Sequence, residues 1–349
     1  MIAQQLYSTY QRYRTLQTHR ISALPIVILM PHSACNCRCV MCDIWKGNKH
    51  AKQLSEEDIT GLLAALKKFG TEEVLLSGGE ALLHNNFFRL CELLRRQKLK
   101  ITLLSTGLLV KRHAEQLLQW VDEIIVSLDG DEKNHDAIRN IPGAFQKLKE
   151  GIQLLHSFNP AYPVSGRTVI HRLNFRQWPA LIQSAMDIGL QRISFLPADV
   201  SSEAFNRPAG WDEPRQQEIL IPREDLPELQ AIIEWVIRHH AAAFNTRFIA
   251  ESPEKLRKIH DYYAAFYGLN PFPYKKCNAP WVSAVVEADG TVRPCFFHAP
   301  LGNIHQDPLD KILNNKEAIH FRKTLDMDTN SICTKCVCYL NLSPLTHLK

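Results

Sequence analysis

The residues of this chain best suited to metal chemistry are its ten cysteines, which form two groups with one cysteine left apart. Disulfide frameworks of this density belong to small secreted proteins, in which the cysteines are spread along the chain. Grouped cysteines in a reducing compartment usually bind metal, so the sequence predicts two metal centres. The first group is Cys35, Cys37, Cys39 and Cys42, the second is Cys277, Cys295, Cys333, Cys336 and Cys338, and Cys91 stands alone.

The spacing of the first group favours an iron-sulfur cluster with one open iron. Cys35, Cys39 and Cys42 form a C-x3-C-x2-C pattern, and three thiolates can hold three irons of a cubane while the fourth stays free for a chelating ligand. An electron-transfer cluster would close every iron, and structural zinc usually takes four ligands from paired C-x2-C knuckles. Because Cys37 as a ligand would give an unusual C-x-C-x2-C spacing, we predict that Cys37 is not one.

A second motif accompanies the triad. The triad is followed by Trp45 and then by Ser77-Gly78-Gly79-Glu80 at the end of the second predicted strand, and this combination resembles the radical S-adenosylmethionine superfamily. In that family the methionyl amine and carboxylate of S-adenosylmethionine chelate the open iron, and the Gly-Gly-Glu stretch lies against the methionyl group. Glycine without a Cβ lets the backbone approach a ligand closely. The resemblance therefore implies cofactor contacts from Ser77, Gly78, Gly79 and Glu80.

The chain departs from the family pattern at two positions. Ala81 stands where the family usually has proline, and Met41 stands where an aromatic residue usually precedes the last cysteine. Neither change removes a required atom. Methionine is flexible and polarizable, so we expect Met41 to pack against the adenine of the cofactor.

Further cofactor contacts are implied at later strand ends. The segment Ser127-Leu-Asp129-Gly130, with Arg139 after it, resembles the family's Ser-x-Asp-Gly segment. A hydroxyl and a guanidinium suit the carboxylate and ribose of the cofactor, so the resemblance implies contacts from Ser127 and Arg139. Ser105 and Thr106 take the equivalent place after the third strand. The alternatives are a strand-end cap for Ser127 and a solvated helix-start charge for Arg139.

The second group of cysteines resembles the auxiliary domains of the same enzymes. Cys277, Cys295, Cys333 and Cys336 form a C-x17-C-x37-C-x2-C pattern with Gly290 five residues before Cys295, as in Twitch and SPASM extensions. A complete SPASM domain holds two clusters on about seven cysteines, so five cysteines fit one auxiliary [4Fe-4S] cluster better. A zinc ribbon is the alternative, because four thiolates also suit zinc.

Two cysteines remain outside these ligand sets. Cys338 either is a spare thiol or replaces Cys336 as the last auxiliary ligand. Cys91 lies at helical spacing from Phe87 and Leu94, so a place in the hydrophobic core explains it most simply.

Short strands alternate with amphipathic helices through the first two hundred or so residues. This alternation predicts a parallel α/β sheet, and the family resemblance implies a partial (β/α)6 TIM-like barrel. Functional residues then lie at the C-terminal ends of the strands. The predicted strands are residues 25–30, 74–77, 101–105, 124–128, 168–170 and 193–196, and the predicted helices are residues 55–69, 86–97, 111–121, 144–158 and 177–189.

The alternation stops after residue 196. Residues 197–222 read as a long polar loop, a kind of segment that is commonly functional or disordered, and helices are predicted over 223–244 and 253–267. Residues 281–287 and 291–295 flank an Asp-Gly turn and predict a β-hairpin. We therefore expect a helical extension at 1–24, a radical S-adenosylmethionine core at 25–250 and a small hairpin-plus-helix cluster domain at 251–349.

The composition limits the partners. The formal charge is +5 over 349 residues, without a run of Lys or Arg, so nucleic acid is an unlikely partner. Residues 1–20 are polar and do not resemble a signal peptide, and the apolar run at 26–30 is too short to span a bilayer. No membrane association is expected, and these features predict a cytoplasmic protein.

The resemblance implies an oxidoreductase or related radical enzyme. It reductively cleaves S-adenosylmethionine to a 5′-deoxyadenosyl radical, which abstracts hydrogen from a substrate, with electrons from a flavodoxin- or ferredoxin-type donor. The family acts on small molecules and on peptides, and we favour a small molecule because peptide modifiers often carry an extra N-terminal recognition domain and a full SPASM tail. The alternative of another class is a nonenzymatic iron-sulfur or zinc protein, which would need neither a vacant iron nor the Gly-Gly-Glu stretch.

Overall fold

A curved nine-stranded sheet forms the centre of the computed structural model. The structure describes residues 2–346 and 348. Six consecutive strands are parallel and stand in the order β6-β5-β4-β3-β2-β1. This is the partial barrel that the sequence predicted. The strands are β1 Ile26–His32, β2 Glu73–Gly78, β3 Lys100–Ser105, β4 Glu123–Ser127, β5 Val164–Ile170 and β6 Arg192–Pro197.

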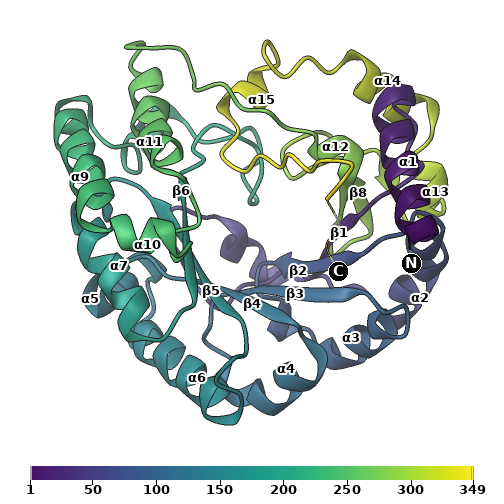
Figure 1. The fold of residues 1–349 in the computed structure, drawn as a ribbon, viewed down its shortest axis with the longest axis horizontal. Helices are drawn as coiled ribbons and strands as arrows, with labels where there is room; N and C mark the ends of the chain where they lie inside the picture. The colour runs from purple at the N-terminus through teal and green to yellow at the C-terminus, as the bar shows by residue number, and fades with distance from the viewer. Residues whose placement is uncertain (1, 347, 349) are drawn as a thin grey trace.

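Helices join the strands and cover the convex side of the sheet (Figure 1). Helix α2 begins with a capping box, because the Ser55 hydroxyl accepts from the Asp58 amide and the Asp58 carboxylate accepts from the Ser55 amide. Helix α5 was not predicted from periodicity. The connecting helices are α2 Glu56–Lys68, α3 Phe87–Arg95, α4 Ala114–Trp120, α5 Glu132–Arg139, α6 Ala144–Phe158 and α7 Trp178–Asp187.

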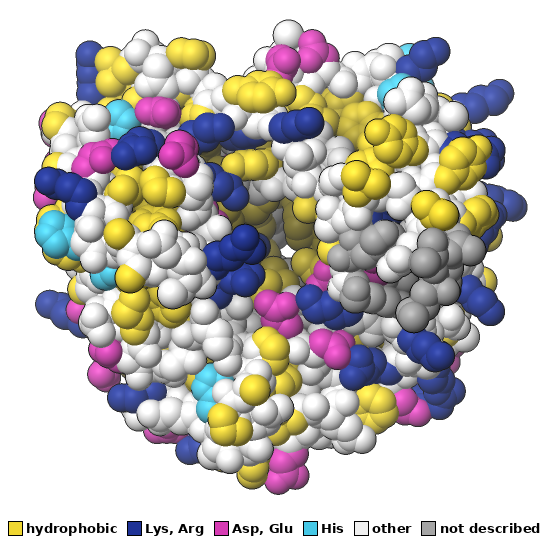
Figure 2. Space-filling model, in the orientation of Figure 1, with side chains coloured by type: hydrophobic (Ala, Val, Ile, Leu, Met, Phe, Trp, Pro, Cys, Tyr) yellow, Lys and Arg dark blue, Asp and Glu magenta, His cyan; other side chains and the backbone are white. Residues whose placement is uncertain are grey.

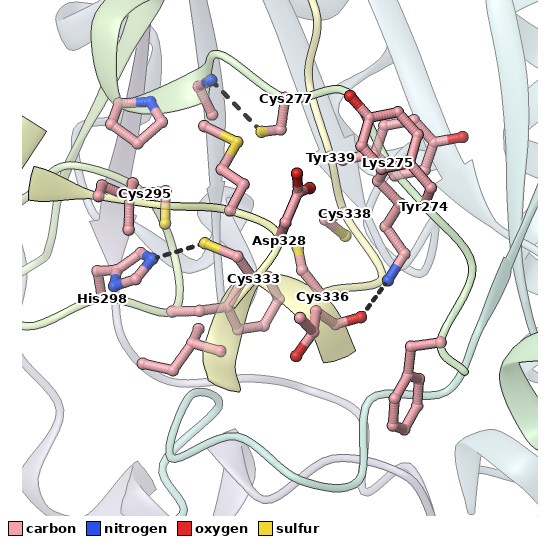
Figure 3. A pocket seen from close by; sticks show the side chains of 18 of the residues that line it. Tyr274, Lys275, Cys277, Cys295, His298, Asp328, Cys333, Cys336, Cys338 and Tyr339 are labelled. Atoms are coloured by element: carbon pink, nitrogen blue, oxygen red, sulfur yellow. Dashed lines mark hydrogen bonds between the residues drawn. The ribbon is translucent and has the colours of Figure 1, made fainter. Parts of the chain in front are cut away.

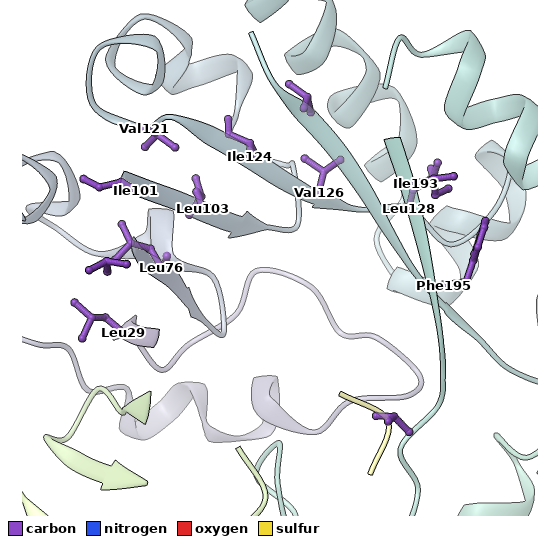
Figure 4. Packing of buried hydrophobic residues seen from close by; sticks show 14 of the residues in the cluster. Leu29, Leu76, Ile101, Leu103, Val121, Ile124, Val126, Leu128, Ile193 and Phe195 are labelled. Atoms are coloured by element: carbon purple, nitrogen blue, oxygen red, sulfur yellow. The ribbon is translucent and has the colours of Figure 1, made fainter. Parts of the chain in front are cut away.

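The main core lies between the sheet and these helices (Figure 4). Buried aliphatic residues from successive strands, such as Leu29, Leu76, Leu103 and Val126, form one continuous layer. In β5 burial alternates along the strand, and Arg167 lies among the half-buried positions. Because side chains alternate between the faces of a strand, Arg167 belongs to the concave face, inside the barrel.

The C-terminal region extends the same sheet. The predicted hairpin is present as β7 Ser283–Val286 and β8 Thr291–Arg293, followed by β9 Gly302–Asn303. Its strand β7 also pairs in parallel with β1, from Ile26 opposite Ser283 onward, which the sequence did not predict. A second apolar cluster joins β1 to this region through Ile28, Trp281 and Leu342. The cluster domain is therefore attached to the first barrel strand.

The remaining helices precede β1 or follow β6 along the chain. Helix α1 Ile2–Thr18 packs beside the C-terminal region (Figure 1), where the Arg12 guanidinium donates to the Thr346 carbonyl. Arg12 also pairs at 2.5 Å with Glu72, which directly precedes β2. None of the helices in the part of the chain that the structure describes is long and apolar enough to cross a membrane. The others are α8 Glu213–Gln217, α9 Leu226–His239, α10 Ala241–Asn245, α11 Pro253–Phe266, α12 Ala279–Val282, α13 Leu309–Ile312, α14 Lys316–Thr324 and α15 Ser331–Lys335.

Two candidate iron-sulfur sites

The predicted triad lies in the loop that follows β1, and its thiols are free. Asn48 fixes the start of this loop, since its amide donates to the Cys35 carbonyl at 2.8 Å and accepts from the Cys35 amide at 3.0 Å. The Trp45 indole donates to the Cys42 carbonyl at 2.9 Å and fixes the end. Side chains outside the triad therefore hold the loop backbone and leave the sulfur atoms available. No spacing rule in the sequence pointed to Asn48.

Helix α5 holds the middle of the cysteine loop. The amides of Arg38 and Val40 donate to the carbonyls of Arg139 and Ile138, each at 3.0 Å. Carbonyls in the last turn of a helix have no partner within the helix, and here the cysteine loop supplies the donors. The segment after Ser127 thus positions the first site through its backbone as well as through side chains.

Gly78 and Gly79 lie directly against the cysteine loop. A Cβ on Gly79 would stand 2.2 Å from the carbonyl oxygen of Ala34, and a Cβ on Gly78 would stand 2.7 Å from that of His32. The Glu80 amide donates to the Ala34 carbonyl at 2.8 Å. The missing side chains therefore admit the loop backbone, a reason for glycine that differs from the ligand approach expected from the sequence.

Glu80 is fully buried and joins the ends of β2 and β3. Its carboxylate accepts from the Thr106 amide and hydroxyl, both at 2.7 Å, and from the Ser105 hydroxyl at 3.1 Å. Burial raises the pKa of Glu80, and these donors oppose the rise. Glu80 and Ser105, both predicted as cofactor contacts, bind each other here. A direct contact of either with the cofactor stays a prediction.

The four thiols of the loop differ in their electrostatics. Hydrogen bonding to Cys35 and Cys39 raises the pKa of Cys37. The hydrogen bond from Cys37 and the charge of Arg139 together lower the pKa of Cys39 to about 6, although burial opposes this change. For Cys42, burial dominates and raises the pKa to about 12. The pKa of Cys37 and that of Cys42 are both raised, so these values do not separate ligands from nonligands, and the exclusion of Cys37 stays a prediction.

Arg139 is buried beside the cluster loop. Its Nη2 pairs with Asp129 at 2.5 Å and its Nη1 donates to the Cys39 sulfur at 3.4 Å. Burial would lower the pKa of Arg139, but Asp129 and the cysteines raise it above its usual value. The alternative of a solvated charge is therefore wrong, and Arg139 ends α5 instead of starting a helix. Among the described residues, the half-buried hydroxyls of Ser77 and Ser127 have no hydrogen-bond partner.

The long loop after β6, residues 197–222, packs against the cysteine loop. The Trp211 indole donates to the Asp43 carboxylate at 2.7 Å, and the buried Arg207 donates to the Met41 carbonyl at 2.8 Å. Residues of the predicted 197–222 loop therefore lie directly against the cysteine loop, and the short helix α8 Glu213–Gln217 interrupts this loop, which the sequence did not predict. Composition alone gave no sign of these partners.

The same loop also reaches the C-terminal region. Phe205 contacts Phe297 edge-to-face, with ring centroids 6.1 Å apart, while its neighbour Asn206 donates to the Asp43 carbonyl at 3.2 Å. Asp43 follows Cys42, and Phe297 stands two residues after Cys295. Two consecutive loop residues therefore connect the surroundings of the two cysteine groups.

The second group of cysteines surrounds a cavity of about 180 Å³ (Figure 3). The His298 ring nitrogen Nε2 lies 3.2 Å from the Cys333 sulfur, a neighbour that the cysteine spacing did not indicate. Lys275 donates to the Thr334 carbonyl at 2.7 Å, and burial lowers its pKa to about 8. The cysteines that line the cavity are Cys277, Cys295, Cys333, Cys336 and Cys338.

Cys338 differs from the other four cysteines. It is the exposed member of the group, yet burial raises the pKa of its thiol, and Arg167 and Asp199 are among its electrostatic neighbours. Because Arg167 lies on the concave face of the sheet, this neighbour places Cys338 on the side of the C-terminal region that faces the barrel. Figure 2 shows a hollow there, with apolar side chains in its depth and charged ones around its opening.

Both groups fit iron-sulfur clusters better than a single metal ion. Within residues 2–346 and 348, no three His, Cys, Asp or Glu side chains converge as ligands of one ion would. Thiolates sharing one zinc lie about 2.3 Å from it, whereas those of a cubane each bind a different iron. The free thiols of the second group line an apolar cavity with room for a cluster, which suits the second arrangement. Their assignment as ligands stays a prediction.

Comparison with known proteins agrees with this geometry. Residues 29–185 match the radical SAM superfamily, and residues 277–337 match the SPASM iron-sulfur cluster-binding domain. The Fe-coproporphyrin III synthase of Methanosarcina barkeri is 25% identical over 82% of this chain and 73% of its own length. The sporulation killing factor maturation protein SkfB of Bacillus subtilis is 24% identical over 83% of this chain, which spans 65% of SkfB.

A solved structure supports the fold. SuiB of Streptococcus suis, crystallised with its precursor peptide SuiA, aligns with a TM-score of 0.66 at 16% identity, covering 95% of this chain and 72% of SuiB. At this identity the likeness concerns the fold, and it extends over the barrel and the C-terminal region together.

Proposed function

We propose that this chain, a radical S-adenosylmethionine enzyme with a C-terminal SPASM domain, removes a hydrogen atom from a small organic substrate held between the barrel and that domain. Membership of this family sets aside the alternative of a nonenzymatic iron-sulfur or zinc protein. The cofactors are S-adenosylmethionine and [4Fe-4S] clusters, and when bound they supply the electron and the 5′-deoxyadenosyl radical.

The triad would hold the first cluster, and the surrounding residues would fix its position. Asn48, Trp45 and the end of α5 hold the loop backbone. Ser77 and Ser127 lie at the ends of β2 and β4 with free hydroxyls, and these would bind the polar groups of S-adenosylmethionine. Such preorganised donors cost little reorganisation when the ligand binds.

One observation carries the proposal: the loop at 197–222 contacts the surroundings of both cysteine groups through the neighbouring residues Phe205 and Asn206. A substrate in the hollow would therefore have the first site on one side and the auxiliary site on the other. A cluster held by the second group of cysteines would supply an electron acceptor beside the hollow, which suits an oxidation of the substrate. We propose one such cluster, on Cys277, Cys295, Cys333 and Cys336.

Arg167 supports a polar substrate with an acidic group. Its Nε donates to the Ser194 hydroxyl at 3.3 Å, and within the described residues its two terminal nitrogens have no hydrogen-bond partner. A guanidinium fork open toward the hollow suits a carboxylate or phosphate. The likeness to Fe-coproporphyrin III synthase also supports a small molecule. The electron donor would be a flavodoxin or ferredoxin.

A peptide substrate is the second candidate. SkfB is named as a maturation protein, and SuiB was solved with a precursor peptide. The hollow opens to solvent (Figure 2), so a chain segment could enter it.

One experiment tests the function and separates the two substrate classes. The anaerobically reconstituted protein is reduced with dithionite and given S-adenosylmethionine and a deuterated extract of the cells that encode it. Deuterium in 5′-deoxyadenosine, unaffected by protease treatment of the extract, would support a small molecule, and loss of the label after protease would support a peptide. Failure to form 5′-deoxyadenosine with a full complement of iron would refute the proposed function.

A further inference from the structure

Two buried arginine-aspartate pairs flank the cysteine loop. Arg139 pairs with Asp129 at 2.5 Å on one side, and Arg207 pairs with Asp199 at 3.1 Å on the other. All four residues are buried. Burying an ion pair seldom adds much stability, because desolvation offsets the attraction. Stability alone therefore does not explain why two buried ion pairs lie beside one loop.

The two pairs differ in what they donate to. Arg207 donates to backbone oxygen, at Met41 and at Asp199 itself. Arg139 donates to sulfur, because its Nη1 lies 3.4 Å from the Cys39 Sγ. We infer that Arg139 is a positioning residue of the first cluster: it hydrogen-bonds the Cys39 thiolate and raises the reduction potential of that cluster. The inference rests on the iron-sulfur assignment of the triad and is independent of the substrate.

Two of the three guanidinium nitrogens of Arg139 have partners, and its buried Nε has none among the described residues. Asp129 occupies Nη2 and Cys39 occupies Nη1, while the residue is 7% exposed. Its backbone carbonyl accepts from the Arg38 amide at 3.0 Å, so the residue is tied to the loop at both ends. This differs from the contact with S-adenosylmethionine that the family resemblance implied. A hydrogen bond to a cluster sulfur stabilises the reduced, more negative state, which is a recognised means of tuning the potential.

The test compares two charge-neutral double variants. Arg139→Gln with Asp129→Asn removes the pair that bonds to sulfur, and Arg207→Gln with Asp199→Asn removes the equally buried pair that does not. The midpoint potential of the first cluster is measured by EPR-monitored titration without S-adenosylmethionine, with the auxiliary cluster as the internal control. We expect a lower potential in the first variant alone. An unchanged potential there, or an equal fall in both variants, would overturn the inference.

If a variant fails to assemble its cluster, a measurement on the wild-type protein tests the hydrogen bond from Arg139 to Cys39. In protein labelled with ¹⁵N-arginine, the reduced first cluster should show a ¹⁵N hyperfine coupling before S-adenosylmethionine is added. Lack of that coupling in a fully assembled cluster would refute the hydrogen bond. Failure of the wild-type triad to assemble any cluster would instead refute the proposed function, so the two failures are distinguishable.

Discussion

Replacing Gly79 by alanine would place a methyl carbon 2.2 Å from the carbonyl oxygen of Ala34 and 2.8 Å from that of Ser33. Neither neighbour is a side chain that can rotate away, so the cysteine loop itself must shift. Overpacking of this kind costs about 1–3 kcal/mol, and losing the bond from the Glu80 amide to Ala34 adds about 1 kcal/mol. We expect the free energy of unfolding to fall by about 2–4 kcal/mol, with loss of iron from the first site.

Gly61 provides the matched control. It lies exposed within α2, and a Cβ there meets nothing within 4 Å. Gly61→Ala should therefore raise stability by about 0.5–1 kcal/mol, because alanine favours the helix. Urea denaturation of the apo-protein and iron analysis after reconstitution measure both effects. A Gly79→Ala protein with the wild-type midpoint and iron content would refute the close approach of Gly79 to the loop.

Three further predictions concern other parts of the molecule. Cys336→Ser should remove the auxiliary cluster and about half of the iron, whereas Cys338→Ser should leave the iron content unchanged. The reverse pattern would make Cys338 the ligand in place of Cys336. Trp211→Phe should cost about 1.5–3 kcal/mol, the usual range for a hydrogen bond to a charged group such as the Asp43 carboxylate, and an unchanged urea midpoint would show that the loop is not anchored there. Burial lowers the pKa of His171 from 6.5 to about 3. Below pH 6.5 this histidine is therefore protonated in the unfolded chain but stays neutral in the native state. Its contribution to stability is therefore present above pH 6.5 and is lost as the pH falls, by up to about 1.4 kcal/mol per unit, and His171→Phe should reduce the difference in urea midpoint between pH 7.5 and 5.5.

The sequence was sufficient for the parts of the fold that depend on local patterns. Six strands, the connecting helices other than α5 and the hairpin at Asp289-Gly290 agree with the structure because each follows from periodicity or turn chemistry. The pairing of β7 with β1 joins Ser283 to Ile26. No local pattern specifies that pairing, since it depends on which edge of the sheet is free.

Cysteine spacing indicated the two sites but not the residues that hold them. Asn48 makes two hydrogen bonds with Cys35, and Trp211 makes one with Asp43 across 168 residues of chain. Neither residue type nor spacing distinguishes Asn48 or Trp211 from other polar residues. Glycine at position 79 was expected to make room for a ligand, whereas it makes room for Ala34. Motifs therefore identified the chemistry, while tertiary contacts determine the role of each motif residue.

The central claim is that the three thiolates of Cys35, Cys39 and Cys42 leave one iron open to S-adenosylmethionine. A protein in which Cys277, Cys295, Cys333 and Cys336 are replaced by alanine should hold the first cluster alone. Its reduced EPR spectrum should change when S-adenosylmethionine is added, and a methionyl ¹⁵N label should give a coupling in ENDOR. An unchanged spectrum without this coupling, recorded on a fully assembled cluster, would contradict the account.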